Sequence, residues 1–254
     1  AGLAGQVLGV LLEGIQLLEN GKHYFLSRPR RFGKSLLLDT LKELFEGHEA
    51  LFQGLAIHQH WDWSVQYPVL RLSFGRKNYR DPDALQESLH QQLSRLEEHF
   101  QLGSRFADAG GRFADLLERI RIQGGRPVVV LIDEYDKPIL DALESPAVAE
   151  ANRDFLRGFY ATIKDFDAHI RFSFLTGVSK FSKVSLFSGL NNLKDITLDP
   201  RYSTICGYTD HDLDTVFAPE LPGLDREEIR AWYNGYHWLG EGVYNPFDIL
   251  QLFD

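Results

Sequence analysis

A basic stretch, SRPRRFGKS (residues 27–35), carries the residue types that bind phosphate groups. Gly33-Lys34-Ser35 supplies the last three positions of the pattern G-x-x-x-x-G-K-[ST], in which backbone N–H groups surround the phosphates, the lysine contacts the β and γ oxygens and the hydroxyl binds magnesium. Arg28 occupies the position of the first glycine, so the front of this loop must turn differently from a glycine-led loop, with Pro29 able to set its entry.

The loop precedes an apolar helical pattern, so its anion would lie at a helix N-terminus, where N–H groups and the helix dipole favour negative charge. The alternative is a solvated basic turn that caps the helix, and three matching residues do not decide between the two. In the nucleotide interpretation seven residues contact the ligand: Arg30, Arg31, Phe32, Gly33, Lys34, Ser35 and Leu36.

An acidic pair, Asp133-Glu134, follows the continuous apolar run RPVVVLI (residues 126–132). Such a run is typical of a central parallel strand that is buried on both faces. At the end of that strand Asp133 would hold magnesium together with Ser35, and Glu134 would activate the attacking water as a catalytic residue beside Lys34. The alternative is a pair of solvated turn residues or a helix cap, and Asp136 is interpreted as a cap for the segment that starts near Pro138.

Thr176 ends a third apolar run, IRFSFL (residues 170–175). Two roles remain open for its hydroxyl: a catalytic position between the attacking water and the γ-phosphate, or a bond to its own backbone. Four downstream cations are candidates for a charge-neutralising finger. They are Lys180, Lys183, Lys194 and Arg201. Because the sequence lacks an N-K-x-D guanine-recognition motif, we expect the nucleotide to be ATP.

Strands and helices alternate along the chain, which predicts an α/β fold with a mainly parallel sheet. In such a sheet ligands bind beyond the carboxyl ends of the strands, where the basic loop, the acidic pair and Thr176 all lie. Strands are expected at 22–26, 68–74, 126–132 and 170–175, and helices at 35–45, 81–100, 113–122, 147–166, 210–217, 225–236 and 246–253. We predict an ATPase-like domain over residues 1–200 and a small helical subdomain over residues 201–254.

The composition excludes several classes of protein. A formal charge of −9 argues against a surface that binds nucleic acid through many phosphate contacts. The single cysteine, Cys206, cannot form an intrachain disulfide, which favours a cytoplasmic location. The apolar N-terminal stretch of twelve residues is shorter than the ~20 needed to cross a bilayer, so we expect no membrane association.

Two aromatic segments contain residue types that could form a metal site or a docking surface. HQHWDW (residues 58–63) has two histidines but no further metal ligands in a recognised pattern, so aromatic packing in a loop or strand edge is the favoured interpretation. The C-terminal aromatic residues are expected to form the core of the subdomain rather than a docking surface. They are Trp232, Tyr233, Tyr236, Trp238 and Tyr244.

Several long segments together resemble a bacterial family of AAA-ATPase-like proteins, relatives of the STAND-type and archaeal P-loop ATPases. They are RPRRFGKSLLLDTLKELF, LIDEYDKPI, FLTGVSKFSKVSLFSGLNNLKDITLDPRY, and WYNGYHW with YNPFDIL, and the resemblance spans residues 20–254. It implies a three-layer P-loop NTPase fold of the additional-strand type, in which the strand before Asp133 is not adjacent to the strand before the loop. It also implies that arginine at the first glycine position is usual, and that a nuclease-like PD-(D/E)XK domain often follows, through which a nucleic acid or partner protein would bind.

Two functions are compatible with these residues. The first is a magnesium-dependent ATPase that acts as a conformational switch. The second is a module without hydrolysis, either a nucleotide sensor or a scaffold that binds DNA or protein through Arg28, Arg30 and Arg31. The oligomeric state is not predicted.

Overall fold

The computed structural model describes residues 21–179 and 192–253, and these form a parallel five-stranded sheet with helices on both faces. The strands are β1 (His23–Ser27), β2 (Val69–Ser73), β3 (Val128–Asp133), β4 (Ile170–Gly177) and β5 (Lys194–Asp195). The helices are α2 (Lys34–Phe45), α3 (Pro82–His99), α4 (Ala109–Gly124), α5 (Lys137–Leu140), α6 (Pro146–Asp165), α7 (Asp210–Thr215), α8 (Arg226–Tyr233) and α9 (Pro246–Leu252).

The strand order is β2-β3-β4-β1-β5, and every pairing is parallel. Strand β4 therefore lies between β1, which leads into the basic loop, and β3, which leads into the acidic pair. This order confirms the additional-strand α/β architecture with three layers. The basic loop and the acidic pair therefore leave the sheet one strand apart, at the carboxyl ends of the strands, where parallel sheets bind their ligands.

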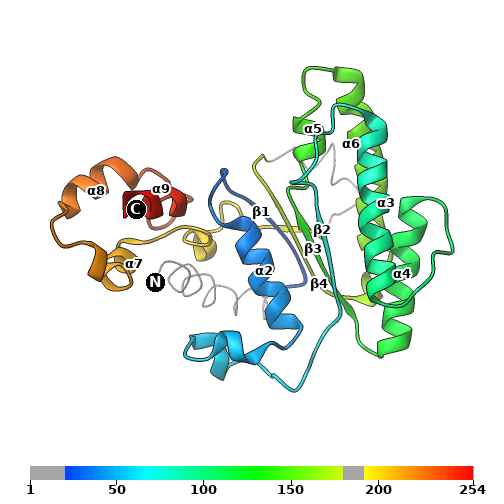
Figure 1. Cartoon of the computed structure of the whole chain (residues 1–254), viewed down its shortest axis with the longest axis horizontal. Coiled ribbons are helices and arrows are strands. Elements are labelled where there is room, and N and C mark those ends of the chain that lie inside the picture. Colours follow the sequence, from blue (N-terminus) through cyan, green and yellow to red (C-terminus); the bar gives the residue numbers. More distant parts are fainter. Residues whose placement is uncertain (1–20, 180–191, 254) are drawn as a thin grey trace.

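Strand β3 shows how the sheet becomes the middle layer. Val128, Val130 and Ile132 belong to the cluster that packs under α3, α4 and α6, whereas Val129 and Leu131 belong to the cluster that packs under α2. Successive side chains of a strand point to opposite faces, so a continuous apolar run is needed to fill both layers. Figure 1 shows α2 on one face of the sheet and α3, α4 and α6 on the other.

The C-terminal region has its own small core as well as contacts with the sheet. Tyr208, Leu213 and Ile249 are members of a third buried cluster, drawn from residues 208–253, and helices α7, α8 and α9 lie on the α2 side of the molecule (Figure 1). Tyr202 and Val243 instead pack in the same cluster as α2. The division into domains at residue 200 stays a prediction.

A buried histidine joins β1 to β4 at the edge opposite the basic loop. His23 contacts Ser173 Oγ through Nδ1 at 2.7 Å and Asp167 Oδ1 through Nε2 at 2.5 Å, and Lys22 pairs with the same aspartate. Burial lowers the pKa of His23 and outweighs the opposing effect of Asp167. Among the described residues, no helix combines the length and the hydropathy that a bilayer span requires.

Candidate active site

Three loops meet at the carboxyl edge of the sheet. Ser27 pairs in register with Gly177, and Ile132 pairs with Leu175, so β1, β3 and β4 end at the same level. The backbone closes this edge further, because the N–H of Arg28 donates to Gly177 O at 3.1 Å. The basic loop, the acidic pair and the end of β4 therefore lie together, as their positions in the sequence predicted.

The loop is anchored by Arg28, whose side chain is 1 % exposed. Its guanidinium donates to the backbone oxygens of Thr197 (3.0 Å), Tyr202 (2.9 Å) and Ile205 (3.3 Å). It also lies 3.9 Å from the centre of the Trp238 ring. A planar guanidinium with donors on three nitrogen atoms can reach carbonyls that lie apart from one another, which the single nitrogen of a lysine cannot do. Arg28 thus holds the front of the loop to the C-terminal region, and this contact could not be seen from the basic stretch alone.

The other basic-loop residues face different surroundings. Phe32 is buried and packs edge-on against Tyr236 at 4.7 Å between ring centres, whereas Arg30 and Arg31 are exposed. The guanidinium of Arg31 lies 4.1 Å from the centre of the Phe247 ring on α9. Arg30 is thus the one of the three arginines whose exposed side chain makes no hydrogen bond, ion pair or ring contact with another described residue.

Lys34 is the first residue of α2 and is mostly buried. Its ammonium donates to the loop's own backbone oxygens, Arg28 O at 2.9 Å and Pro29 O at 2.7 Å. Burial lowers its pKa, and the charges of Cys206, Asp133 and further acidic residues act in the opposite direction. The lysine therefore lies within electrostatic reach of the acidic pair, and Cys206 is buried beside it rather than exposed.

The N-terminus of α2 has no side-chain cap. Gly33 occupies the N-cap position in the left-handed conformation (φ 77°), and the first turn contains no acidic residue. Gly33 lacks a side chain and so offers the helix no cap, which leaves the first N–H groups open to an external anion. Ser35 and Leu36 follow in this turn, and Ser35 is exposed.

Asp133 is held by two neighbours at the end of β3. The hydroxyl of Thr176 donates to Asp133 Oδ1 at 2.7 Å, and Arg71 Nη2 lies 4.0 Å from Asp133 Oδ2. Thr176 is fully buried and its hydroxyl holds the carboxylate rather than bonding to its own backbone, while a catalytic role for this residue stays a prediction. Arg71 also forms an ion pair with Asp39 and a 3.4 Å contact with Ser35 O, which links α2 to β2.

Glu134 has a strained backbone and a partly buried carboxylate. Its φ is 53°, a conformation that costs about 1 kcal/mol or more for a residue other than glycine. Burial raises its pKa, with the charge of Asp133 adding to this shift and that of Lys34 opposing it. A Cβ added to Gly75 would lie 3.3 Å from the Glu134 carboxylate, so the glycine leaves room for this side chain.

Asp136 does not cap the following helix, which corrects the interpretation from the sequence. Its side chain makes no cap bond to α5, although it occupies the N-cap position. Instead Oδ2 accepts from Val178 N (3.0 Å), Ser179 N (2.7 Å) and Ser179 Oγ (2.6 Å). The buried carboxylate therefore fixes the chain that leaves β4, just beyond Thr176.

A cleft of about 800 Å³ opens beside the acidic pair. Its walls come from α2, β2, α3, the end of β3 and the loop after β2. The lining residues are Ser35, Asp39, Arg71, Ser73, Gly75, Arg76, Lys77, Tyr79, Ser88, Gln91, Gln92, Arg95, Asp133 and Glu134. It brings together both predicted magnesium ligands, Ser35 and Asp133, and the predicted base, Glu134.

The predicted finger residues lie elsewhere or outside the described residues. Lys180 and Lys183 are outside them. Lys194 lies 5.7 Å from the centre of the Tyr24 ring, and Arg201 pairs with Asp199, so neither lines the cleft. Arg76 and Lys77, the cations that follow β2, line the cleft and were not predicted from the sequence. Strand β2 ends at the same sheet edge, and that position was the signal that would have found them.

The two weaker sequence candidates, the HQHWDW segment and the C-terminal aromatic residues, have different outcomes. Trp61 and Trp63 lie against the cluster under α2, which agrees with aromatic packing at HQHWDW. Trp232, however, is 77 % exposed, so its assignment to the subdomain core was wrong. It stands on α8, where most of the side chains face solvent.

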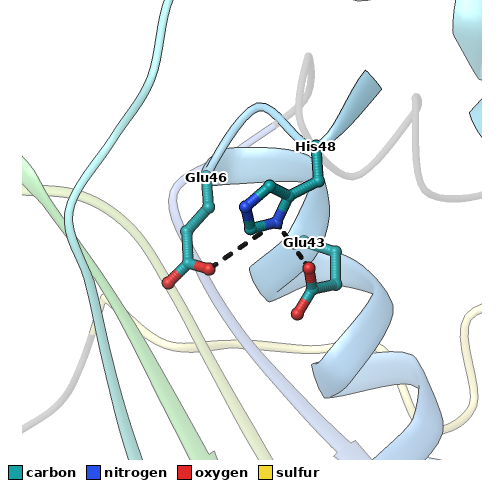
Figure 2. A group of neighbouring side chains, drawn as sticks. All are labelled: Glu43, Glu46 and His48. Carbon is teal, nitrogen blue, oxygen red and sulfur yellow. Dashed lines mark hydrogen bonds and ion pairs between the residues drawn. The ribbon is translucent and has the colours of Figure 1, made fainter. Parts of the chain in front are cut away.

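A second group of possible metal ligands lies at the far end of α2. Figure 2 shows Glu43, Glu46 and His48 turned toward one another. Lys42 already contacts both carboxylates, at 3.2 and 2.7 Å, and His48 lies 2.5 Å from Glu43. The ammonium of Lys42 offsets the charge of the two acids and also suits the negative end of the helix dipole. The group is therefore an ion-pair network at the C-terminal end of α2, about 16 Å along the helix from Lys34.

Comparison with known proteins agrees with this geometry. A family model described as "Predicted AAA-ATPase" matches residues 15–187, which include both the loop and the acidic pair. The chain belongs to this AAA-ATPase-like family. A relative in Azotobacter chroococcum mcd 1, described as "Uncharacterized protein in vnfD 5'region", is 60 % identical over 239 residues. That match covers 94 % of the chain and 46 % of the relative, so the AAA-ATPase-like chain spans less than half of this longer protein.

Proposed function

We propose that this AAA-ATPase-like domain binds ATP with magnesium, hydrolyses it and acts as a conformational switch. One observation carries the proposal: an uncapped helix N-terminus and its buried lysine, Lys34, lie at the same sheet edge as Asp133 and Glu134. Family membership supports nucleotide binding in general, and the residues below support the particular chemistry.

The residues present suit a nucleotide triphosphate. The open first turn of α2 supplies backbone donors, and Lys34 supplies a cation that, among the described residues, donates to the neutral oxygens of Arg28 and Pro29. A charge-assisted bond to phosphate is stronger than a bond to a neutral carbonyl, so the ammonium gains by exchanging partners. Arg30, which is exposed at the loop, adds charge on the solvent side.

The oxygen ligands that magnesium prefers are present on both sides of the cleft. The hydroxyl of Ser35 and the carboxylate of Asp133 would hold the ion, and both residues line the cleft. A bound magnesium ion would neutralise negative charge on the phosphate oxygens. Thr176 keeps Asp133 in place through its 2.7 Å hydrogen bond, so it acts as a positioning residue.

Glu134 is the group best placed to accept a proton from the attacking water. It lies next to Asp133, lines the same cleft and has room beside Gly75. Its strained φ of 53° points to a constrained position, since such conformations persist where the surrounding structure enforces them. The proton would pass from water to a carboxylate oxygen of Glu134.

The switch part of the proposal rests on the contacts of the loop. Arg28, Arg31 and Phe32 all contact residues within 197–253, through backbone oxygens or aromatic rings. A change in loop shape on nucleotide binding would therefore alter the docking of the C-terminal region. Contact with a nucleic acid or a partner protein through a C-terminal domain of a longer protein stays a prediction, as does a cytoplasmic location.

Calorimetric titration with ATP and magnesium, combined with a turnover assay, tests the proposal. Lys34→Ala should weaken ATP binding by about 10- to 100-fold, because it removes a charged hydrogen bond. Lys164→Ala, at an exposed lysine near the end of α6, is the matched control and should bind as the wild type does. Glu134→Gln should bind ATP and lose at least about 100-fold in turnover.

Each outcome separates the hypotheses. No ATP binding by the wild type rejects the proposed function, and equal turnover by Glu134→Gln rejects the role of this residue. Binding without turnover in the wild type favours the nucleotide sensor. A short DNA duplex that competes with ATP and weakens steeply with salt would favour the scaffold. The burial of Arg28 argues against the scaffold, since its guanidinium already bonds to backbone oxygens.

A further inference from the structure

The cleft extends well beyond the nucleotide loop. Its far wall is the end of β2, the loop after it and one side of α3, and residues 28–34 are not among its lining. Figure 1 shows β2 at the sheet edge with α3 alongside it, away from the C-terminal region. A nucleotide bound over α2 would therefore leave this far part of the cleft for a second ligand.

The far part of the cleft is cationic although the protein carries a net charge of −9. Arg71, Arg76, Lys77 and Arg95 all line it. Arg71 is paired with Asp39, as described above, and Lys77 lies 3.6 Å from a carboxylate of α3.

Arg76 and Arg95 differ from these two cations. No ion pair joins either of them to another described residue, and both are exposed. Arg76 is close enough to Arg71 for its charge to lower the pKa of that guanidinium, whereas the charge of Asp133 acts in the opposite direction. Because Arg71 and Lys77 have acidic partners, Arg76 and Arg95 are the cleft-lining cations whose charge an added anion would balance.

The wall that carries these arginines is fixed to the sheet. The amide oxygen of Gln92 on α3 accepts from Ser73 N at 2.8 Å, and Tyr79 OH lies 3.2 Å from Ser88 Oγ on the same helix. Arg95 is one turn of α3 beyond Gln92, so its position relative to β2 is set by that contact. A volume of about 800 Å³ lies within the range of small-molecule sites.

We propose that this part of the cleft binds a second, phosphate-bearing ligand through Arg76 and Arg95, beside the terminal phosphate of the nucleotide. The neighbouring nucleotide rests on the proposed function, whereas the anion site itself does not. Guanidinium groups present paired N–H donors that match phosphate oxygens, and two of them balance a phosphate dianion. The phosphate belongs either to a small molecule or to a nucleic acid backbone, and the experiment distinguishes these sources.

The test is a titration of the full chain, saturated with magnesium and a non-hydrolysable ATP analogue, with three probes. Inorganic phosphate and glycerol 3-phosphate represent small ligands, and a short single-stranded oligodeoxythymidylate represents a nucleic acid. Replacement of both arginines, Arg76→Gln with Arg95→Gln, should weaken probe binding by about 100-fold, or about tenfold for each guanidinium. Arg153→Gln with Arg157→Gln, on the exposed side of α6, removes the same charge elsewhere and should change it less than about twofold.

The outcomes are separable from those of the proposed function. Loss of binding only in the Arg76 and Arg95 variant supports the site, and the probe that binds most tightly at equal phosphate concentration identifies the source. No binding of any probe by the wild type overturns the site, as does an equal loss in the two double variants. A parallel titration with ATP decides the other hypothesis: ATP binding without phosphate binding overturns only the second site. The reverse result is that the nucleotide-free chain binds phosphate but not ATP, and that the Arg76 and Arg95 variant loses the phosphate binding. This result overturns only the proposed function.

Discussion

Arg28→Gly would restore the usual first glycine of the phosphate-binding pattern, yet we expect it to destabilise the protein. The change removes a charged donor from the oxygens of Thr197, Tyr202 and Ile205 and from the adjacent Ser27 O. Each buried oxygen left without its donor costs about 1–3 kcal/mol, and the lost stacking on Trp238 costs about 1–2 kcal/mol.

The sum of these costs overestimates the effect, because water can enter the space left by a large side chain and the contacts are not independent. We therefore expect a loss of about 4 kcal/mol in the free energy of unfolding, near the upper limit for a single substitution. Arg28→Lys should fall between the wild type and the glycine variant, because an ammonium on a flexible stem cannot serve three separated oxygens.

Urea unfolding measures this difference, with Arg30→Gly as the matched control. Both variants introduce glycine in the same loop, so both gain about 1 kcal/mol of unfolded-state entropy, and the difference between them isolates the buried guanidinium. Arg30 is exposed and should show little beyond that shared loss. If the two variants unfold within about 1 kcal/mol of each other, the anchoring role assigned to Arg28 is wrong.

Two further predictions concern the two edges of the sheet. Gly75→Ala should lower ATP turnover by roughly 10- to 100-fold, because the added Cβ would press on the Glu134 carboxylate. In the control Gly103→Ala the added Cβ meets no atom within 4 Å, so turnover should not change. Equal turnover rates in the two variants would contradict the role of the Gly75 contact. Because the folded pKa of His23 is lowered from 6.5, the unfolded chain binds more protons below that pH, so stability should fall as pH decreases from 6.5 toward the folded pKa. His23→Gln, which keeps a polar group near Asp167, should unfold with a flatter pH dependence in urea titrations across this range, and parallel curves would refute the assignment.

The secondary structure was predictable because local patterns determine it. The run VVVLID gave a strand buried on both faces, and Leu37, Leu41 and Leu44 gave the helix spacing of α2. The positions of the loop and the acidic pair at strand ends followed from the same patterns. The strand order could not be obtained from periodicity, since it depends on pairings between segments more than 100 residues apart, and it entered only through the family resemblance.

The roles of individual site residues were harder to predict, because they depend on partners that are distant in the sequence. Arg28 was interpreted as a departure from the glycine pattern and, in the scaffold alternative, as a residue that binds DNA or protein, but its partners lie about 170 residues downstream. Asp136 was interpreted as a helix cap because the sequence places it before Pro138, whereas its bonds go to the chain after β4. Arg76 and Arg95 come from different elements, so no local pattern groups them.

The loop also shows why an arginine can stand where related patterns have glycine. The left-handed conformations occur at Arg31 (φ 67°) and Gly33 (φ 77°), and Arg28 is not among the residues with positive φ. The front of the loop therefore does not need glycine, and the strain moves to Arg31, where it costs about 1–2 kcal/mol. Stacking of Arg31 on Phe247 offsets part of that cost. Because Arg28 and Arg31 both contact residues within 197–253, the shape of the phosphate-binding loop is determined jointly by the sheet and the C-terminal region. Glycine at position 28 alone would remove an anchor without recreating the usual loop.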